Sequence, residues 1–214
     1  MSGFLVSCVG AYHDSGIGTG GFMYVDGESQ IHLDLIDSTG LTIHQNKWYR
    51  FIRSEKALVV YNAAGIEQVL FLREVEDAHD ILIFQNQLWC VSTMTNEIII
   101  YSLAGDLIER LKFPGERDAW HLNCLCEFGG QVFISAFGKF DQHRGWNEGA
   151  SWEKGFIMNV RTGAIVVDGL CGPHNPRNID GKWMVCDSHK RSLVIVDNGT
   201  RKEIALGGFT RGFC

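Results

Sequence analysis

Residues 80–113 read DILIFQNQLWCVSTMTNEIIIYSLAGDLIERLKF. Four apolar runs rich in Ile, Leu, Val, Phe and Trp follow one another here, separated only by the short polar or small segments NQ, MTN and AGD. Short runs of this kind between turn residues are typical of β-strands joined by hairpins, and they lack the length and periodicity of amphipathic helices. The stretch therefore predicts a unit of four antiparallel strands.

The same four-run pattern recurs along the chain. It appears over residues 40–72, again over 121–170, where it includes HLNCLCEF and QVFISAFG, and again over 175–208, where it includes KWMVCDS and SLVIVDN. Four-stranded units at a spacing of about 40 residues indicate a β-propeller in which each unit forms one blade. We therefore expect an all-β protein.

The two ends of the chain predict the number of blades. Residues 4–37 contain three apolar runs that match the second, third and fourth strands of a blade, and the chain ends at GFTRGFC without a complete further unit. If Thr210–Cys214 forms the missing inner strand and pairs with residues 4–10, the ring closes as a five-bladed β-propeller without an open edge. We expect a single domain over residues 1–214. The alternative is a truncated larger propeller.

Composition narrows the class of partner. Of the 214 residues, 45% are hydrophobic and 21% charged, and the net charge of −6 argues against nucleic-acid binding, which requires a basic surface. No segment approaches the roughly 18 apolar residues of a membrane span, and the N-terminus lacks the features of a signal peptide. We expect a cytoplasmic protein that binds a small molecule, and the sequence predicts no oligomeric state.

Three histidines occupy similar positions at the start of predicted inner strands. His79 precedes Leu88 by nine residues, His174 precedes Trp183 by nine, and His121 lies close to the same place in its own unit. In a propeller the inner strands all start on one face, so these imidazoles are expected at one end of the central channel. The side chains of Asn123, Arg177 and Arg211 are expected nearby.

Two long insertions are predicted on the same face, at residues 11–21 and 139–154, where the second and third strands of a blade are joined. Insertions on one face of a scaffold commonly carry binding groups. The expected substrate-binding residues are His13, Asp14, His143, Arg144, Trp146 and Trp152.

Four motifs carry a resemblance to a known family: HLN at 121–123, RGWNEG at 144–149, GPHNPR at 172–177 and GFTRG at 208–212. With them, the C-terminal half of the chain resembles the β-propeller proteins grouped as domain of unknown function 4915. Members typically show Pro-His-Ser-Pro-Arg at the third motif, where this chain has Asn175 in place of Ser. The resemblance implies the fold and marks candidate positions, and it implies no substrate.

These positions favour a metal-dependent enzyme. Three neutral imidazoles, His79, His121 and His174, suit a divalent Zn, Fe or Cu ion with an open position for water or substrate. Arg177 and Arg211 are then expected to hold an anionic group of a small polar substrate, and Asn123 to support the ligands.

Three alternatives remain open at this point. The same histidines and arginines suit a metal-free enzyme in which one histidine is a general acid or base. They also suit a non-catalytic propeller that binds a sugar or an anion, with Trp146 and Trp152 stacking on the ligand. A protein-interaction scaffold is the third.

Overall fold

The computed structural model of the chain describes residues 3–8, 21–27, 29–147 and 149–212. Within these residues the chain forms strands and turns and no helix, so the predicted all-β class is confirmed. The strands form five antiparallel sheets, the five blades of a β-propeller. Cα packing groups the chain into two compact units, residues 1–90 with 100–108 and residues 91–99 with 109–214. No helix in the described part is long and apolar enough to cross a membrane.

The first unit contains two whole sheets, and in each the strands pair antiparallel in sequence order. The first sheet is β1 (Phe4–Cys8), β2 (Gly21–Asp26) and β3 (Ser29–Asp34). The second is β4 (Ser38–His44), β5 (Lys47–Ile52), β6 (Ala57–Asn62) and β7 (Gly65–Phe71). A third sheet contributes to both units and consists of β8 (Ala78–Phe84), β9 (Gln87–Ser92), β10 (Glu97–Ser102) and β11 (Leu107–Lys112).

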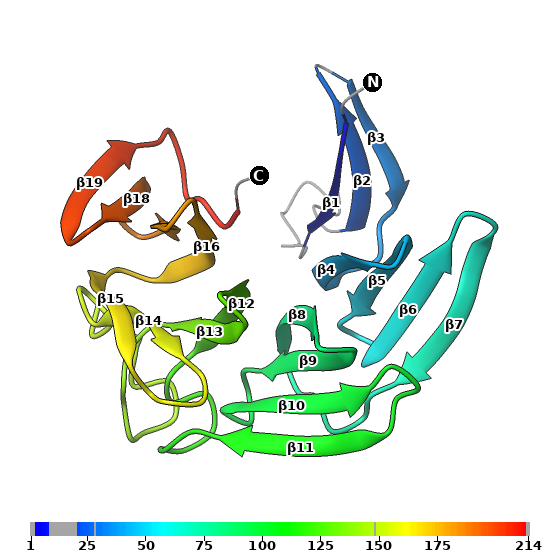
Figure 1. Cartoon of the computed structure of the whole chain (residues 1–214), viewed down its shortest axis with the longest axis horizontal. Coiled ribbons are helices and arrows are strands. Elements are labelled where there is room, and N and C mark those ends of the chain that lie inside the picture. Colours follow the sequence, from blue (N-terminus) through cyan, green and yellow to red (C-terminus); the bar gives the residue numbers. More distant parts are fainter. Residues whose placement is uncertain (1–2, 9–20, 28, 148, 213–214) are drawn as a thin grey trace. The chain divides into compact units, whose positions relative to one another are not determined.

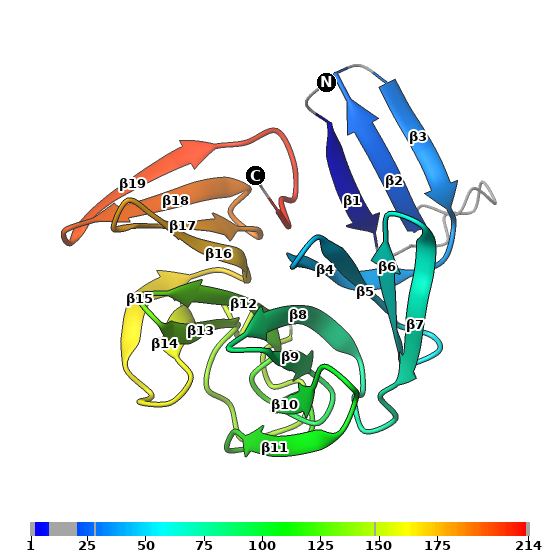
Figure 2. The same ribbon diagram turned by 45° about the vertical axis from the view of Figure 1, so that its right-hand side comes forward.

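The second unit contains the other two sheets (Figure 1). One is β12 (Leu122–Phe128), β13 (Gln131–Ala136), β14 (Gly155–Asn159) and β15 (Ile165–Leu170). The other is β16 (Pro173–Ile179), β17 (Lys182–Asp187), β18 (Ser192–Asp197) and β19 (Thr200–Ala205). The inner strands of these sheets, β12 and β16, pack against each other (Figure 2). The strand boundaries match the apolar runs of the sequence.

Turn residues fix the register of these sheets. Asp180 and Gly181 join β16 to β17 with φ of 51° and 81°, and Asn198 and Gly199 join β18 to β19 with φ of 47° and 80°. A two-residue hairpin turn with positive φ at both positions matches the twist of the paired strands, and Asn, Asp and Gly adopt that conformation at low cost. Each strand therefore pairs directly with the next.

Burial follows the order of strands in a blade. Ile98, Ile99 and Ile100 on β10 are fully buried on both faces of the sheet, whereas every residue of β19 is exposed. The third strand β10 therefore reads as a continuous apolar run and the fourth strand β19 as a charged one. This is the contrast that the sequence shows between EIIIYSL and LIERLKF.

The inner strands of the second unit are bulged at their starts. The pairing of β12 with β13 shifts register between Leu122 and Leu125, and that of β16 with β17 shifts between His174 and Arg177. A bulge inserts a residue and redirects side chains, and bulges are frequent beside functional sites. The HLN and PHNPR motifs thus lie where the backbone departs from regular pairing.

The C-terminal segment corrects one part of the fold prediction. Residues 206–212 follow β19 without forming a strand and return toward β16 (Figure 1). The Thr210 carbonyl accepts a hydrogen bond from Ser188 Oγ, and the Arg211 side chain contacts His174, so the second unit holds the segment. Residues 210–212 form no strand, contrary to the prediction that they supply an inner strand for residues 4–10, and the first sheet has three strands among the described residues. Residues 9, 10, 213 and 214 of that prediction lie outside the described residues.

Candidate functional site

Buried Asp118 and partly buried His121 form a pair where the chain enters β12. His121 Nδ1 lies 2.8 Å from Asp118 Oδ1. A carboxylate only accepts hydrogen bonds, so Nδ1 carries the proton and Nε2 is the basic nitrogen of the neutral ring. Burial alone would raise the pKa of Asp118, but the hydrogen bonds and charges of His121 and Arg144 outweigh it and hold that pKa below its ordinary value. The arrangement is that of an imidazole oriented by an ionised carboxylate.

The ring of Phe137, next to the end of β13, touches three imidazoles. Its centroid lies 4.3 Å from that of His121, 5.6 Å from that of His174 and 5.7 Å from that of His189. Trp146 packs on the ring of His121 at 4.1 Å. Phe209 packs on His174 and His189 at 6.0 and 5.6 Å. These six residues, called the aromatic group below, are His121, Phe137, Trp146, His174, His189 and Phe209.

Hydrogen bonds fix the tautomer of His174, which is only 3% exposed. Its Nδ1 lies 3.0 Å from the Gly172 carbonyl and 2.8 Å from Ser188 Oγ. The Ser188 hydroxyl donates its one proton to the Thr210 carbonyl, so it accepts from His174 and Nδ1 carries the hydrogen. Nε2 is then an acceptor, and it receives an N–H of Arg211 at 3.3 Å. His174 thereby holds the Arg211 guanidinium at the aromatic group.

The insertion at 139–154 is anchored on the segment that precedes β12. The Glu116 amide donates to the Asp141 carbonyl, and the His143 amide donates to the Glu116 carboxylate. Asp118 then receives three contacts: Arg144 Nε donates to Oδ2 at 3.1 Å, and the Trp146 indole and the Arg144 amide both donate to its carbonyl. One buried aspartate therefore positions His121, Arg144 and Trp146 together.

A surface pocket of about 700 Å³ lies beside this anchor. Its lining includes Arg144, whose Nε is bound to the Asp118 oxygen opposite to the one that holds His121. The other lining residues are Met94, Thr95, Lys112, Gly115, Glu116, Arg117 and His143. His143 and Arg144, expected to bind substrate, thus lie in one pocket, whereas Trp146 lies in the aromatic group.

The remaining predicted residues are placed differently. Asn123 is fully buried, with Nδ2 bound to the His121 carbonyl and Oδ1 without a hydrogen-bond partner. Arg177 is exposed, and its Nη1 is within 3.5 Å of the Leu125 carbonyl. Trp152 is 53% exposed under the Lys190 ammonium, apart from the aromatic group. His13 and Asp14 lie outside the described residues.

The predicted metal ligands fall in different units. His79 belongs to the first unit, where its Nδ1 lies 3.1 Å from the Asp77 carbonyl, while His121 and His174 belong to the second. Among the described residues, no group of three or more His, Cys, Asp or Glu side chains is arranged to hold a metal ion. The centre formed by His79, His121 and His174 stays a prediction.

Sequence reasoning missed His189. Its side chain approaches Gly172 so closely that a Cβ on that glycine would lie 2.2 Å from the imidazole, and Gly172 has φ of +66°. Burial and the neighbouring charge of His121 lower the pKa of His189, which favours its neutral form. His189 lies in the connection between the second and third strands of its blade, the same class of connection that carries the two insertions. The position of His189 in this connection, within the sequence CDSHKRS, was the signal from which its place at the site could have been predicted.

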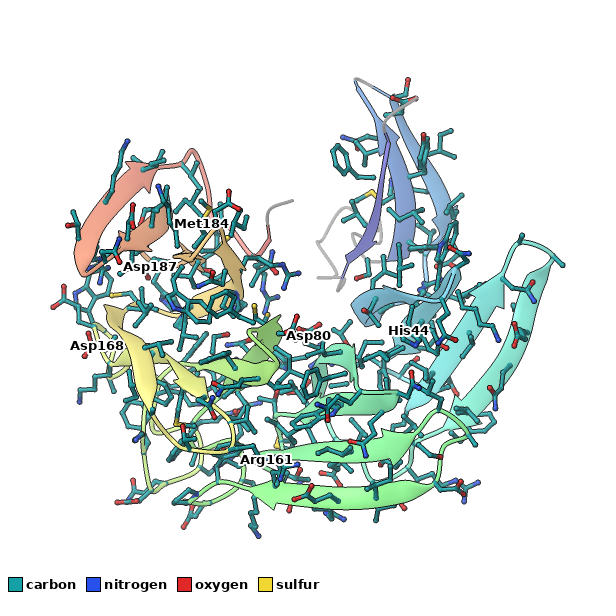
Figure 3. All side chains as sticks on the ribbon, viewed as in Figure 1. His44, Asp80, Arg161, Asp168, Met184 and Asp187 are labelled. Carbon is teal, nitrogen blue, oxygen red and sulfur yellow. The ribbon has the colours of Figure 1, made fainter. Side chains whose placement is uncertain are left out.

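Asp187, at the end of β17, is a buried carboxylate among the strands of its blade (Figure 3). Its Oδ1 accepts the Cys171 amide at 2.6 Å, and Arg201 lies 3.6 Å from Oδ2. Burial raises the pKa of Asp187 to about 6, against the opposing effects of the Cys171 amide, Lys190 and Arg201. The folded protein therefore binds this proton more tightly than the unfolded chain does.

We expect Asp187→Asn to remove a pH dependence of stability. Since the folded pKa exceeds the unfolded value, ionisation of Asp187 destabilises the fold progressively as the pH rises from about 4 to about 6, by on the order of 2–3 kcal/mol. The amide has no such charge, so the variant gains stability relative to wild type over this range. Urea unfolding at pH 4, 5, 6 and 7 measures it, with exposed Asp168→Asn as the matched control. A wild-type to variant difference that is constant with pH would contradict this account.

Comparisons with known proteins bear on the fold and the family. No curated protein matches the sequence significantly. A streptogramin B lyase structure is similar with a TM-score of 0.58 and 16% identity, over 87% of this chain and 59% of that one, so the chain spans little more than half of that lyase. A second similar structure is that of virginiamycin B lyase from Staphylococcus aureus, in a catalytically inactive histidine-to-alanine variant with quinupristin. The TM-score is 0.60 and the identity 11%, over 96% of this chain and 75% of the lyase.

These likenesses show the β-propeller fold. The family match is more specific, because it covers residues 30–214 and so extends well beyond the C-terminal half in which the HLN, RGWNEG, GPHNPR and GFTRG motifs lie. The chain belongs to the family described as Domain of unknown function (DUF4915).

Proposed function

We propose that the protein is an enzyme that removes a proton from a small polar or anionic substrate, with His121 as the general base. The observation that carries the proposal is the contact of His121 Nδ1 with the buried, ionised Asp118. The carboxylate fixes the ring so that Nε2 is the basic nitrogen and stabilises the imidazolium that forms when it accepts a proton. The His121 side chain is 12% exposed, so part of the ring faces solvent.

The surroundings of His121 suit such a reaction. Phe137 and Trp146 pack on the ring and on each other, so the imidazole lies against an apolar surface. Arg211, held by His174, supplies a positive charge at the same aromatic group, where it would stabilise negative charge that develops on the substrate. In an elimination, the substrate C–H proton passes to His121 Nε2, the C–H electron pair becomes a double bond, and the leaving group departs with its bonding electrons.

The lyase names of two solved structures support this class of reaction. Both are propellers, and the variant of virginiamycin B lyase shows that the enzyme is inactive when one of its histidines is replaced by alanine. At 11% to 16% identity the substrate does not transfer. We therefore propose lyase-type chemistry on a small molecule in the cytoplasm and name no substrate from these relatives.

The metal centre is the second candidate. Its three histidines suit a Zn, Fe or Cu ion, and such an ion would lower the pKa of a bound water. Against it, both ring nitrogens of His174 have protein partners, so Arg211 would have to leave Nε2 before that nitrogen could bind a metal. Elemental analysis of untagged protein tests this candidate: stoichiometric metal that is lost in both His79→Ala and His174→Ala would establish it.

Asp118→Asn tests the general base. An amide NH₂ in place of Oδ1 would donate to Nδ1 and force the proton of the neutral ring to Nε2, so we expect kcat/KM to fall about 100-fold. Turnover is sought by NMR in a collection of small phosphate, sulfate and carboxylate esters, and ¹⁵N NMR reports the His121 tautomer. Asp168→Asn is the matched control. An unchanged tautomer with full activity would overturn the proposal, and a ligand that binds wild type without turnover would favour a non-catalytic binding protein.

A further inference from the structure

The pocket beside Arg144 has an unusual charge for this protein. Three cations, Lys112, Arg117 and Arg144, line it, and Glu116 is the one acidic residue in that lining. The lining therefore carries a formal charge of +2, from three positive charges and one negative, in a chain whose net charge is −6. A local excess of positive charge on an acidic protein attracts anions specifically to that place.

The anchoring contacts hold this pocket in shape. Glu116 Oε2 is engaged by the His143 amide at 2.9 Å, and His143 Nδ1 is 2.6 Å from the Arg117 carbonyl. The carbonyl requires a donor, so Nδ1 carries the hydrogen and the ring is fixed in orientation. Arg144 is tied to Asp118 through Nε, and its side chain is still 48% exposed, so the guanidinium keeps donors that face solvent at the pocket. The three cations thus line the pocket on a segment whose conformation is fixed by these hydrogen bonds.

We propose that this pocket binds the phosphate or sulfate group of the substrate. The inference deepens the proposed function and rests on it in one respect, that the rest of the substrate reaches His121. Asp118 links the pocket to His121, because one of its oxygens binds Arg144 at the pocket and the other binds the His121 ring. Guanidinium and ammonium groups donate charge-assisted hydrogen bonds to tetrahedral oxyanions, and three of them around one site match a doubly charged group better than a single carboxylate.

The volume of the pocket fits this assignment. About 700 Å³ is within the range of small-ligand sites and exceeds the needs of one oxyanion, so a phosphate or sulfate ester enters together with part of its organic portion. Met94 and the Thr95 methyl group offer apolar contact to that portion. The substrate class is thus a small phosphorylated or sulfated molecule.

Calorimetric titration with inorganic phosphate, sulfate and acetate, at equal ionic strength set with sodium chloride, tests the subsite without any substrate. We expect phosphate or sulfate to bind at least tenfold more tightly than acetate. The paired substitution Lys112→Gln with Arg117→Gln should weaken that binding at least tenfold. The control pair Arg73→Gln with Lys202→Gln makes the same change in charge at exposed positions outside the pocket and should leave binding within twofold.

The two proposals fail separately. If phosphate binding is weakened equally in both pairs of variants, the anion is attracted to diffuse surface charge and the subsite is overturned. Acetate binding as tight as phosphate binding would overturn it as well. His121→Gln leaves the pocket lining intact, so we expect it to bind phosphate as wild type does. Loss of phosphate binding in His121→Gln would also overturn the subsite, because the anion would then depend on the imidazole. The general-base role is judged only by turnover and tautomer.

Discussion

Arg50→Ala is expected to lower the free energy of unfolding by about 3–5 kcal/mol, because it leaves a partly buried carboxylate without its partner. Arg50 is 1% exposed and is the largest fully buried side chain among the described residues. Its guanidinium binds both oxygens of Asp34, the Ile36 carbonyl and Ser38 Oγ. It also lies 4.6 Å over the ring of Phe22. One side chain on β5 thereby ties together the end of β3, the connection to β4 and the start of β4.

Urea unfolding with fluorescence detection measures the effect. Lys47→Ala is the matched control, since Lys47 lies on the same strand and pairs with Glu67 at the surface, where solvent screens the ion pair and its effect on stability is small. Arg50→Met separates packing from charge, because it keeps the apolar stem and removes the guanidinium. Loss of less than 1 kcal/mol in Arg50→Ala would mean that the pair with Asp34 does not hold the first unit together.

His121→Gln is expected to lower kcat by about 1,000-fold with KM changed by less than threefold. General-base catalysis contributes roughly 10²- to 10⁴-fold, and glutamine keeps the size and polarity of the side chain but cannot accept a proton at neutral pH. The limb of the pH–rate profile that reports deprotonation of the base should vanish in the variant. His44→Gln makes the same change at a surface position and should retain wild-type kinetics.

Chemical rescue separates catalysis from structure. His121→Gly leaves a space beside Phe137 and Trp146, and free imidazole added to that variant should restore part of the lost rate in proportion to its concentration. A residue that acts only by packing would show no such rescue. Wild-type kcat in His121→Gln would contradict the assignment of His121 as the base.

The fold could be predicted from sequence because each of its determinants is local. Alternating apolar runs, and pairs such as Asn198–Gly199 and Asp180–Gly181, specify a strand or a hairpin within a few residues. The C-terminal segment was the exception. Its sequence resembles an inner strand, yet contacts of Thr210 and Arg211 with residues more than 20 positions away keep it out of any sheet. Such contacts have no local signal.

The candidate site was predictable only in part, for the same reason. His121, His174, Arg144 and Trp146 were expected near one another from their places in the repeat, and the second unit does bring His121, His174 and Trp146 into the aromatic group. The roles of Asp118 and Phe137 could not be predicted from the sequence, because an aspartate in a connection and a phenylalanine after a strand are both common. Their importance comes from contacts with residues up to 52 positions away, as in Phe137 with His189.

The attachment of the insertion to Asp118 has an evolutionary consequence. A loop that is fixed to its blade by three side chains, His143, Arg144 and Trp146, and by a few main-chain contacts can be exchanged as a unit. Mutations between Trp146 and the return to β14 change the part of the insertion beyond these attachment points, while the strands keep their pairing. Relatives that retain the aspartate, the arginine and the tryptophan are thus free to diverge in the rest of the insertion without rebuilding the scaffold.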